Sequence, residues 1–220
     1  MRAIRIDDET LRAAALAAPR ESRDEMAAPS YLHPNPLVRW LFWKRLDAVA
    51  DFLSRRGARY VSGLDFGCGL GVELPTLSAM TDLVYATDLV LAAGRHVVHR
   101  LALGNVTFVE ADRLSSLPPL DYIVSTDVLE HVQDLEGVVR GAGDALKSGG
   151  TLVVSGPTEH ALYKIGRMLA GFGGKASYHR TDIFRVHEAI VRAGFNLVGH
   201  RALPLPRVVD AFHINAYARR

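Results

Sequence analysis

The chain has 220 residues, of which 49% are hydrophobic and 23% charged, and its formal net charge is +2. These proportions are typical of a globular protein with one sizeable core. So small a charge argues against a nucleic-acid partner, which usually draws a concentrated basic field. The single cysteine, Cys68, excludes an intrachain disulfide. Residues 1–20 carry charges throughout, unlike a secretory signal, and no run approaches the roughly 20 apolar residues that span a bilayer. We therefore expect a cytoplasmic protein with no stable membrane insertion.

Residues 1–57 are predicted to form a helical extension that caps the main domain. A first helix, capped by Asp7 or Asp8, should run through residues 9–18, and the breaker-bounded segment 19–29 is typical of a connector. A second helix is predicted from Pro36 to about Arg56.

That second helix carries two apolar strips at helical spacing. We expect the first strip to pack on the domain; its members are Val38, Phe42, Leu46, Val49 and Leu53. The second strip, which Lys44 and Arg45 interrupt, consists of Leu37, Leu41, Ala48 and Phe52. It is more apolar than a solvent face requires, so it is expected to meet a lid, a substrate or a second chain.

Short apolar strands alternate with helical stretches across residues 58–220, which predicts a parallel sheet with helices on both faces. Strands are expected at 60–66, 83–88, 106–110, 121–126 and 150–156, with helices at 70–80, 90–102 and 133–147. There follow a helix over 158–170 with a glycine-rich tip, a helix over 181–193, and mutually antiparallel strands at 195–203 and 211–219. The predicted fold class is α/β: a doubly wound, mostly parallel seven-stranded sheet with an antiparallel last strand.

The stretch "LDFGCGLG", from Leu64 to Gly71, ends the first of these strands and opens a helix. Glycines at 67, 69 and 71 allow a tight turn and close approach of a ligand to the backbone. The dinucleotide fingerprint would place its third glycine at Val72. Asp65 also opposes a pyrophosphate, whereas its carboxylate suits a ligand that carries an ammonium and a sulfonium. Charge therefore favours a cationic ligand at this turn.

Three further acids lie at strand ends on the same rim. Asp88 comes nineteen residues after Gly69, where a carboxylate can accept both hydroxyls of a ribose. Asp112 follows the third strand and is suited to an adenine amino group, and Asp127 follows the fourth. Asp88 and Asp112 also suit the plainer role of helix N-caps. An acid at four strand ends is nevertheless hard to explain by packing alone.

With these motifs the chain resembles the class I S-adenosylmethionine-dependent methyltransferases, particularly the small-molecule branch of the ubiquinone and menaquinone type. The resemblance rests on "LDFGCGLG", "ATDLV", "EADRL", "DVLEHV", "LKSGGTLVVSGP" and "HRTDIFRVHEAIVRAGF" and covers about residues 60–218. It implies S-adenosyl-L-methionine as cofactor, with the glycine turn at the methionine portion and Asp88 at the ribose. The cofactor-binding residues that it implies are Asp65, Phe66, Gly67, Cys68, Gly69, Gly71, Asp88, Leu89, Asp112, Arg113, Thr126 and Asp127.

Methyl transfer to a hydroxyl needs a base, and histidine is best matched to neutral pH. His160, at the start of the expected lid helix, and His179, before the next helix, are therefore the predicted catalytic residues; each also suits a structural or surface role. Asp127, Glu130 and His131 would share one face of a helical turn and allow a metal site as an alternative. We predict no metal, because "DVLEHV"-like sequences are common without one.

The expected partner is a small-molecule methyl acceptor. The fourth strand lacks the Asn/Asp-Pro-Pro-aromatic motif of enzymes that methylate nucleobase amines. The apolar segment 156–178, together with Trp40 and Trp43, favours an apolar or amphipathic molecule. The same surfaces allow a homodimer, and the two tryptophans with Lys44 and Arg45 allow contact with a membrane surface. Competing functions are a non-catalytic S-adenosylmethionine-binding partner protein, a nicotinamide-dependent oxidoreductase and an aminopropyl transferase that uses the decarboxylated cofactor.

Overall fold

The computed structural model describes residues 1–23, 28–158, 181–205 and 209–220. Within these ranges, seven strands form one sheet in the order β3-β2-β1-β4-β5-β7-β6. Their bounds are Tyr60–Phe66 (β1), Thr81–Thr87 (β2), Val106–Phe108 (β3), Leu120–Thr126 (β4), Leu146–Pro157 (β5), Asn196–Leu205 (β6) and Val209–Ala218 (β7).

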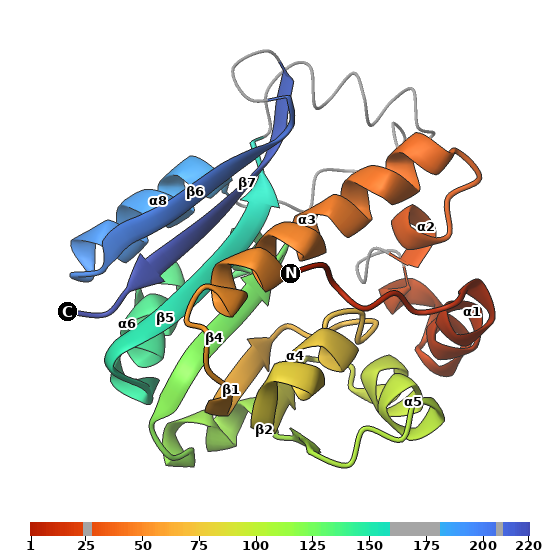
Figure 1. Cartoon of the computed structure of the whole chain (residues 1–220), viewed down its shortest axis with the longest axis horizontal. Helices are drawn as coiled ribbons and strands as arrows, with labels where there is room; N and C mark the ends of the chain where they lie inside the picture. The colour runs from red at the N-terminus through yellow and green to blue at the C-terminus, as the bar shows by residue number, and fades with distance from the viewer. Residues whose placement is uncertain (24–27, 159–180, 206–208) are drawn as a thin grey trace.

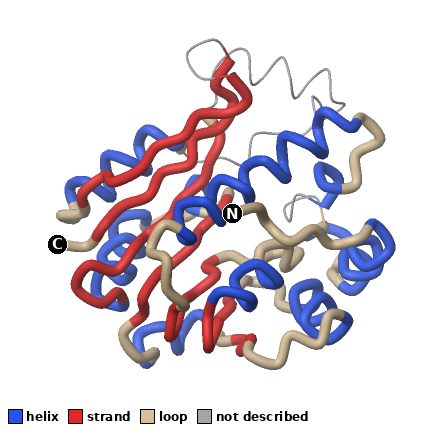
Figure 2. Tube along the Cα trace, in the orientation of Figure 1, coloured by secondary structure: helices blue, strands red, loops and turns tan. Residues whose placement is uncertain are grey.

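The sheet is parallel from β3 to β5, and β7 runs antiparallel to both of its neighbours. Helices cover both faces of the strands, as Figures 1 and 2 show. The predicted fold class, with seven strands and a reversed last strand, is confirmed. Because the parallel strands all end at one edge, the loops after β1, β2 and β4 meet there.

The helices between the strands are shorter than predicted, because each begins after a turn or cap that the apolar pattern does not mark. α4 starts four residues late, since the glycine turn occupies the residues before it. Asp134 and Asp182 cap α6 and α8 by accepting backbone hydrogen bonds. The bounds are Leu74–Met80 (α4), Ala92–Arg100 (α5), Leu135–Ala145 (α6) and Ile183–Arg192 (α8), with short 3-10 turns at Ala111–Ser116 (η2) and Leu129–His131 (η3).

Of two further predicted elements, one is shorter in the structure and the other lies almost entirely outside the described residues. The strand expected at 106–110 is only three residues long. The helix expected over 158–170 and its glycine-rich tip lie outside the described residues, except for Thr158. The backbone N–H of Thr158 donates to Ala211 at 3.0 Å, so this residue continues the pairing of β5 with β7.

The N-terminal region contains α1 (Asp8–Ala17), the 3-10 turn η1 (Arg20–Ser22), α2 (Ala28–Tyr31) and α3 (Pro36–Ser54). The cap of α1 is Asp7, whose carboxylate accepts from the backbone N–H of Thr10 at 2.8 Å. The segment 19–29 is not purely a connector, since it holds η1 and the start of α2. Residues of this region share a buried cluster with the main domain, which includes Ile6, Leu11, Leu46, Leu70 and Val97.

Helix α3 lies across one face of the sheet, and its N-terminal half extends past the ends of the strands (Figure 1). The predicted inner strip is largely correct, because Leu46, Val49 and Leu53 are buried. The second strip was expected to be interrupted by two charged residues. Of these two only Lys44 is at the surface, since the Arg45 side chain is buried; within the strip Ala48 and Phe52 are buried, whereas Leu37 is exposed.

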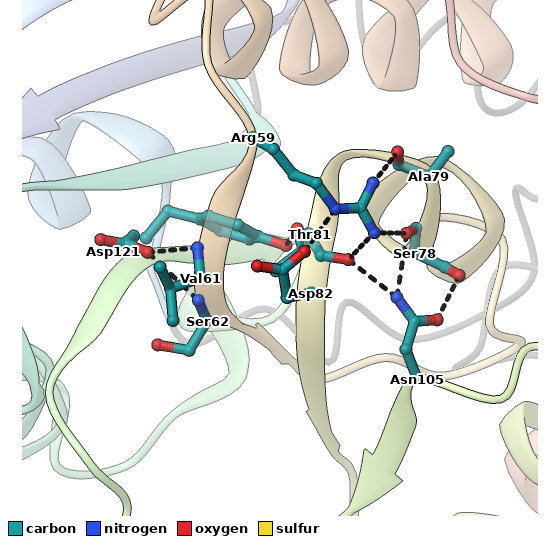
Figure 3. Close-up of polar contacts among 10 residues, drawn as sticks. Arg59, Val61, Ser62, Ser78, Ala79, Thr81, Asp82, Asn105 and Asp121 are labelled. Carbon is teal, nitrogen blue, oxygen red and sulfur yellow. Dashed lines mark hydrogen bonds and ion pairs between the residues drawn. The ribbon is translucent and has the colours of Figure 1, made fainter.

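The opposite edge of the sheet, where β1 and β2 begin, is tied together by polar contacts (Figure 3). The guanidinium of Arg59 donates to Asp82 at 2.5 Å and to the carbonyl of Thr81 at 2.5 Å. The carboxylate of Asp121 accepts from the backbone N–H groups of residues 61 and 62, at 2.7 and 3.1 Å. No helix within the described ranges is long and apolar enough to cross a membrane.

Candidate functional site

A turn built on three glycines connects β1 to α4 at the carboxyl edge of the sheet. Gly67, Gly69 and Gly71 all adopt positive φ, a region that residues with a Cβ rarely enter. A Cβ on Gly67 would lie 2.2 Å from a methyl carbon of Val128, and one on Gly71 would lie 3.1 Å from the Cα of Gly94. The turn therefore requires glycine both for its backbone conformation and for its close packing.

Asp88 holds this turn against the end of β2. Its carboxylate accepts from the backbone N–H of Gly69 at 2.7 Å and from that of Val90 at 3.0 Å. The backbone N–H groups of Gly67 and Cys68 donate to the carbonyl of Thr87 at 2.9 Å each. Burial raises the pKa of the Cys68 thiol well above its ordinary value, which makes this thiol a poor nucleophile.

Two buried carboxyl groups lie behind the turn. Burial raises the pKa of Asp65 to about 7, and the negative charge of Asp88 adds to this effect. Burial also raises the pKa of Glu73, which precedes α4, and the charge of Asp65 acts in the same direction. The neighbouring Thr126 side chain and the positive charge of Arg45 partly oppose that rise. The site is thus a dense cluster of acids whose protonation responds to any cation placed among them.

Helix α3 brings a cation to this cluster. The guanidinium of Arg45 lies between the rings of Phe42 and Phe212, 4.2 and 4.4 Å from their centroids, and only 1% of the residue is exposed. Its Nη1 forms an ion pair with the carboxylate of Asp127, directly after β4. The hydroxyl of Tyr31, whose pKa burial raises, accepts a hydrogen bond from the same guanidinium. The N-terminal region therefore contributes side chains to the carboxyl edge of the sheet.

The backbone at Asp127 is strained, because this non-glycine residue has a φ of +56°. Its N–H donates to the carbonyl of Ser155 on β5 at 2.9 Å, which fixes the turn after β4. Strained residues of this kind concentrate at binding and catalytic sites. Thr126 and Asp127, both predicted for the cofactor pocket, thus lie next to the glycine turn and the buried acids.

The remaining predicted cofactor residues lie at the end of β1, after β2 and on η2. Leu89 is 96% exposed, so its apolar side chain is open to a ligand. Asp112 and Arg113 are exposed on η2. Phe66 points to the opposite face of the sheet from Asp65 and borders an apolar cavity of about 390 Å³. Other residues around this cavity are Ala111, Leu114, Ile123, Leu129, Val138 and Leu152.

The predicted catalytic residues His160 and His179 lie outside the described residues. The three residues of the metal alternative do not share one face of an α-helix, because η3 is a 3-10 turn in which Glu130 is buried and His131 is exposed. In the described part of the chain, no group of three or more His, Cys, Asp or Glu side chains suits a metal ion.

Sequence reasoning missed three residues of the site: Tyr31, Arg45 and Glu73. Arg45 carried a usable signal, because a charged residue within an apolar helical strip must find a partner if the strip is buried. Glu73 follows the glycine motif directly, but an acid before a helix is equally typical of an exposed first turn. Nothing in the sequence marks Tyr31 as a site residue except its position after a proline-bounded segment.

The profile of a methyltransferase domain family matches residues 7–198 of the chain. The chain belongs to this methyltransferase family. The resemblance predicted from the motifs is thereby confirmed, and the match also includes most of the predicted N-terminal extension.

Curated proteins similar to this methyltransferase include the ubiquinone biosynthesis O-methyltransferase of Xylella fastidiosa (strain M23). The two are 34% identical over 140 residues, which cover 58% of this chain and 50% of that protein. An uncharacterised methyltransferase of Mycobacterium tuberculosis is 30% identical over 111 residues, covering 49% of this chain and 55% of the relative. The chain thus spans about half the length of the curated relatives it matches.

Two solved structures share the fold of this methyltransferase. The N-methyltransferase NodS from Bradyrhizobium japonicum WM9, in complex with S-adenosyl-L-homocysteine, superposes with a TM-score of 0.66 at 17% identity, covering 96% of this chain and 99% of that one. Magnesium protoporphyrin IX methyltransferase from Synechocystis PCC 6803 gives a TM-score of 0.68 at 18% identity, covering 97% and 100% of the two chains.

Proposed function

We propose that the protein transfers a methyl group from S-adenosyl-L-methionine to an oxygen atom of a small apolar or amphipathic molecule. The observation that carries the proposal is the glycine turn, pinned by Asp88 and backed by the buried Asp65, at the carboxyl edge of a methyltransferase sheet. The first curated relative is named for O-methylation in ubiquinone biosynthesis, which supports an oxygen acceptor for this chain as well.

The residues present fit this cofactor. The positive φ of Gly67, Gly69 and Gly71 makes a tight turn at which a ligand can approach the backbone. The carboxyl groups of Asp65 and Asp88 suit the ammonium and the ribose hydroxyls, and the exposed side chain of Leu89 offers an apolar surface to a purine. When bound, S-adenosylmethionine supplies a methyl group already activated by its positive sulfur.

The protein then mainly aligns the cofactor with the acceptor and shields both from solvent. Alignment of two reactants can lower a barrier by up to about 7–11 kcal/mol in well-oriented cases. The turn, fixed by the hydrogen bond between Gly69 and Asp88, holds one reactant; the edge formed by Asp127 and Phe212 would face the other. Rigid supports of this kind lose little energy to rearrangement during the reaction.

For the acceptor, the proposal keeps the two histidines predicted from the sequence. His160 and His179 would accept the proton of a hydroxyl as the methyl group arrives. An apolar or amphipathic acceptor is supported by Leu37 and Trp40, which are 71% and 45% exposed on the N-terminal half of α3. Contact with a membrane surface has less support, because Trp43 packs against Tyr31 and Arg45 is buried.

The test begins with calorimetric titration of the purified protein with S-adenosylmethionine, S-adenosylhomocysteine and NAD. Binding of the first two without NAD supports the cofactor assignment, whereas binding of NAD alone would refute it. Acceptors are then screened by mass for a gain of one methyl group, using quinols, polyketides, lipid-linked sugars and small acids. Methylation only at nitrogen would contradict the oxygen assignment, and unchanged turnover in His160→Ala/His179→Ala would remove the proposed bases.

A further inference from the structure

One face of the sheet is covered incompletely where β3 connects to β4. Helices α4, α5 and α6 follow β1, β2 and β4, whereas the connection after β3 holds only the six-residue 3-10 turn η2. A parallel sheet normally buries both of its faces under helices. The face opposite α3, which α6 and α8 cover, therefore has only this short turn beside α6 (Figure 1).

The space that this turn leaves beside α6 is the apolar cavity of about 390 Å³. Strands β1, β4 and β5 supply its floor, the segment around η2 supplies one wall, and α6 supplies the other. Ala142 and Ala145 on α6 are short, and a Cβ on Gly141 would meet nothing within 4 Å, so the helix does not fill the space. Volumes of about 300–1,000 Å³ are typical of sites for small molecules, and the cavity falls within this range.

A buried hydroxyl group faces the cavity from its floor. Ser125 on β4 borders the cavity and is only 1% exposed, and its Oγ has no hydrogen-bond partner among the described residues. Because successive side chains of a strand point to opposite faces, Ser125 points the same way as Ile123, which packs in the cluster that contains α6. Buried polar groups without a partner are costly and rare in native proteins. The Ser125 hydroxyl is therefore positioned to bond to a ligand in the cavity.

The cavity differs in charge and position from the cofactor site. Of the residues predicted to bind the cofactor, only Phe66 borders it. Asp65, which comes directly before Phe66, points to the other face of the sheet. Among the described residues around the cavity, the only charged one is Asp144, which is exposed to solvent. The cavity therefore suits a neutral ligand rather than the charged cofactor.

We propose that this cavity binds a second small molecule, which is neutral and apolar and carries one hydroxyl or carbonyl oxygen. The apolar body of the ligand packs between the sheet and α6, and its oxygen forms a hydrogen bond with the Oγ of Ser125. A serine hydroxyl can both donate and accept, so either kind of oxygen fits. The proposal goes beyond the proposed function and does not rest on it, because Ser125 has no assigned role in binding the cofactor.

Two probes of similar size test the site. 1-Naphthol carries a hydroxyl, and 1-methylnaphthalene has a methyl group in its place. Each is titrated into the full-length protein labelled with ¹⁵N, and binding is followed by NMR chemical shifts. The wild type should bind 1-naphthol with a Kd of about 0.1–1 mM, the range expected for about 11 non-hydrogen atoms. It should bind 1-methylnaphthalene about 3- to 10-fold more weakly, the value of one neutral hydrogen bond.

Three variants locate the binding. Ser125→Ala should abolish the preference for 1-naphthol over 1-methylnaphthalene. Ser155→Ala is the matched control: Ser155 is equally buried and its Oγ also lacks a partner among the described residues, but it pairs in register with Thr126 and so points to the other face of the sheet. It should keep the preference. Gly141→Leu, for which α6 has room, should weaken both probes by about 10-fold or more, because the new side chain occupies the cavity.

Each outcome decides the proposal separately from the proposed function. A wild type that binds neither probe would overturn it, and so would binding that Gly141→Leu leaves unchanged, because the probes would then lie elsewhere. A preference for 1-naphthol that survives in Ser125→Ala would show that this hydroxyl does not recognise the ligand. Saturating S-adenosylhomocysteine should leave 1-naphthol bound; displacement would place the cavity within the cofactor site and refute a second site. Failure of S-adenosylhomocysteine itself to bind would count against the proposed function alone.

Discussion

The carboxylate of Asp88 and the backbone N–H of Gly69 are joined by a hydrogen bond of 2.7 Å. A second bond, from the N–H of Val90 at 3.0 Å, uses the other carboxylate oxygen. The residue predicted for the ribose thus also builds the turn that faces it. A carboxylate has about four acceptor positions, so these two bonds leave room for the two ribose hydroxyls.

Replacing Asp88 by alanine should therefore weaken binding of S-adenosylhomocysteine by about 10- to 100-fold, the loss expected when bonds to a charged acceptor disappear. Titration calorimetry measures the change. Asp82→Ala is the control, because Asp82 is at the opposite end of β2 and pairs with Arg59. Equal affinities for Asp88→Ala and the wild type would show that the carboxylate supports neither the turn nor the ligand.

The double role of Asp88 illustrates what the sequence could predict. The succession of strands and helices along the chain, the glycine turn and the acids at the ends of β1, β2 and β4 follow from local patterns, since short apolar runs and Gly-rich turns have few other uses. The pairing of Arg45 with Asp127 and the role of Glu73 could not be found in this way. Their roles depend on the packing of α3 across the sheet, which brings residue 45 to residue 127 and is not encoded in either local pattern.

Element boundaries were predicted less well for a similar reason. The apolar pattern begins before α4 does, because Leu70 and Val72 are buried as part of the turn rather than the helix. The short β3 ends at Phe108, although the apolar run continues to Val109. In α4 the burial that the pattern reports extends beyond the helical hydrogen bonding, whereas after β3 the N–H of Val109 still donates to the carbonyl of Ala86 at 2.9 Å although the assigned strand has ended.

The buried Asp65 should make the stability of the ligand-free protein depend on pH. Its pKa is about 7 in the folded state and near 3.8 in the unfolded chain. Between these values the folded protein holds a proton that the unfolded chain has lost. Stability from this group is therefore complete below about pH 4 and declines until about pH 7, by at most about 4 kcal/mol. Asp65→Asn should flatten this decline in urea unfolding measured from pH 4.5 to 8.

Asp121 supplies the control for this pH series. Burial would raise its pKa, but hydrogen bonds from Lys147 and from the N–H groups of residues 61 and 62 outweigh that effect and lower it. Its contribution is present above about pH 4 and is lost on further acidification. Asp121→Asn should thus change stability below pH 4 and leave the slope between pH 5 and 7 intact. An unchanged slope in Asp65→Asn would mean that Asp65 is already ionised in the folded state.

The ion pair between Asp127 and Arg45 should contribute strongly to stability. Asp127→Ala is expected to lower the free energy of unfolding by about 3–5 kcal/mol, because it removes the carboxylate that pairs with a buried guanidinium. Asp127→Asn should cost clearly less, since asparagine tolerates positive φ and its amide oxygen still accepts from Arg45. Urea unfolding at pH 7.5 gives both values. Equal losses for the two variants would show that neither the backbone conformation nor the acceptor matters at this position.

Gly67 offers a test of the turn itself. A Cβ there would lie 2.2 Å from a methyl carbon of Val128, and the residue has a φ of +84°. Gly67→Ala should therefore lower the free energy of unfolding by about 2–4 kcal/mol, from the backbone conformation and the overpacking together. It should also reduce affinity for S-adenosylhomocysteine, because the turn must shift to accommodate the new methyl group.

Two further variants separate those causes. Gly57 also has positive φ, +70°, but a Cβ there would meet nothing within 4 Å, so Gly57→Ala should cost only about 1 kcal/mol and leave ligand affinity unchanged. Combining Gly67→Ala with Val128→Ala removes the methyl groups that the new Cβ would strike, and should recover part of the lost stability. If the double variant is no more stable than Gly67→Ala, the close contact with Val128 is not what requires glycine, and the backbone conformation alone accounts for it.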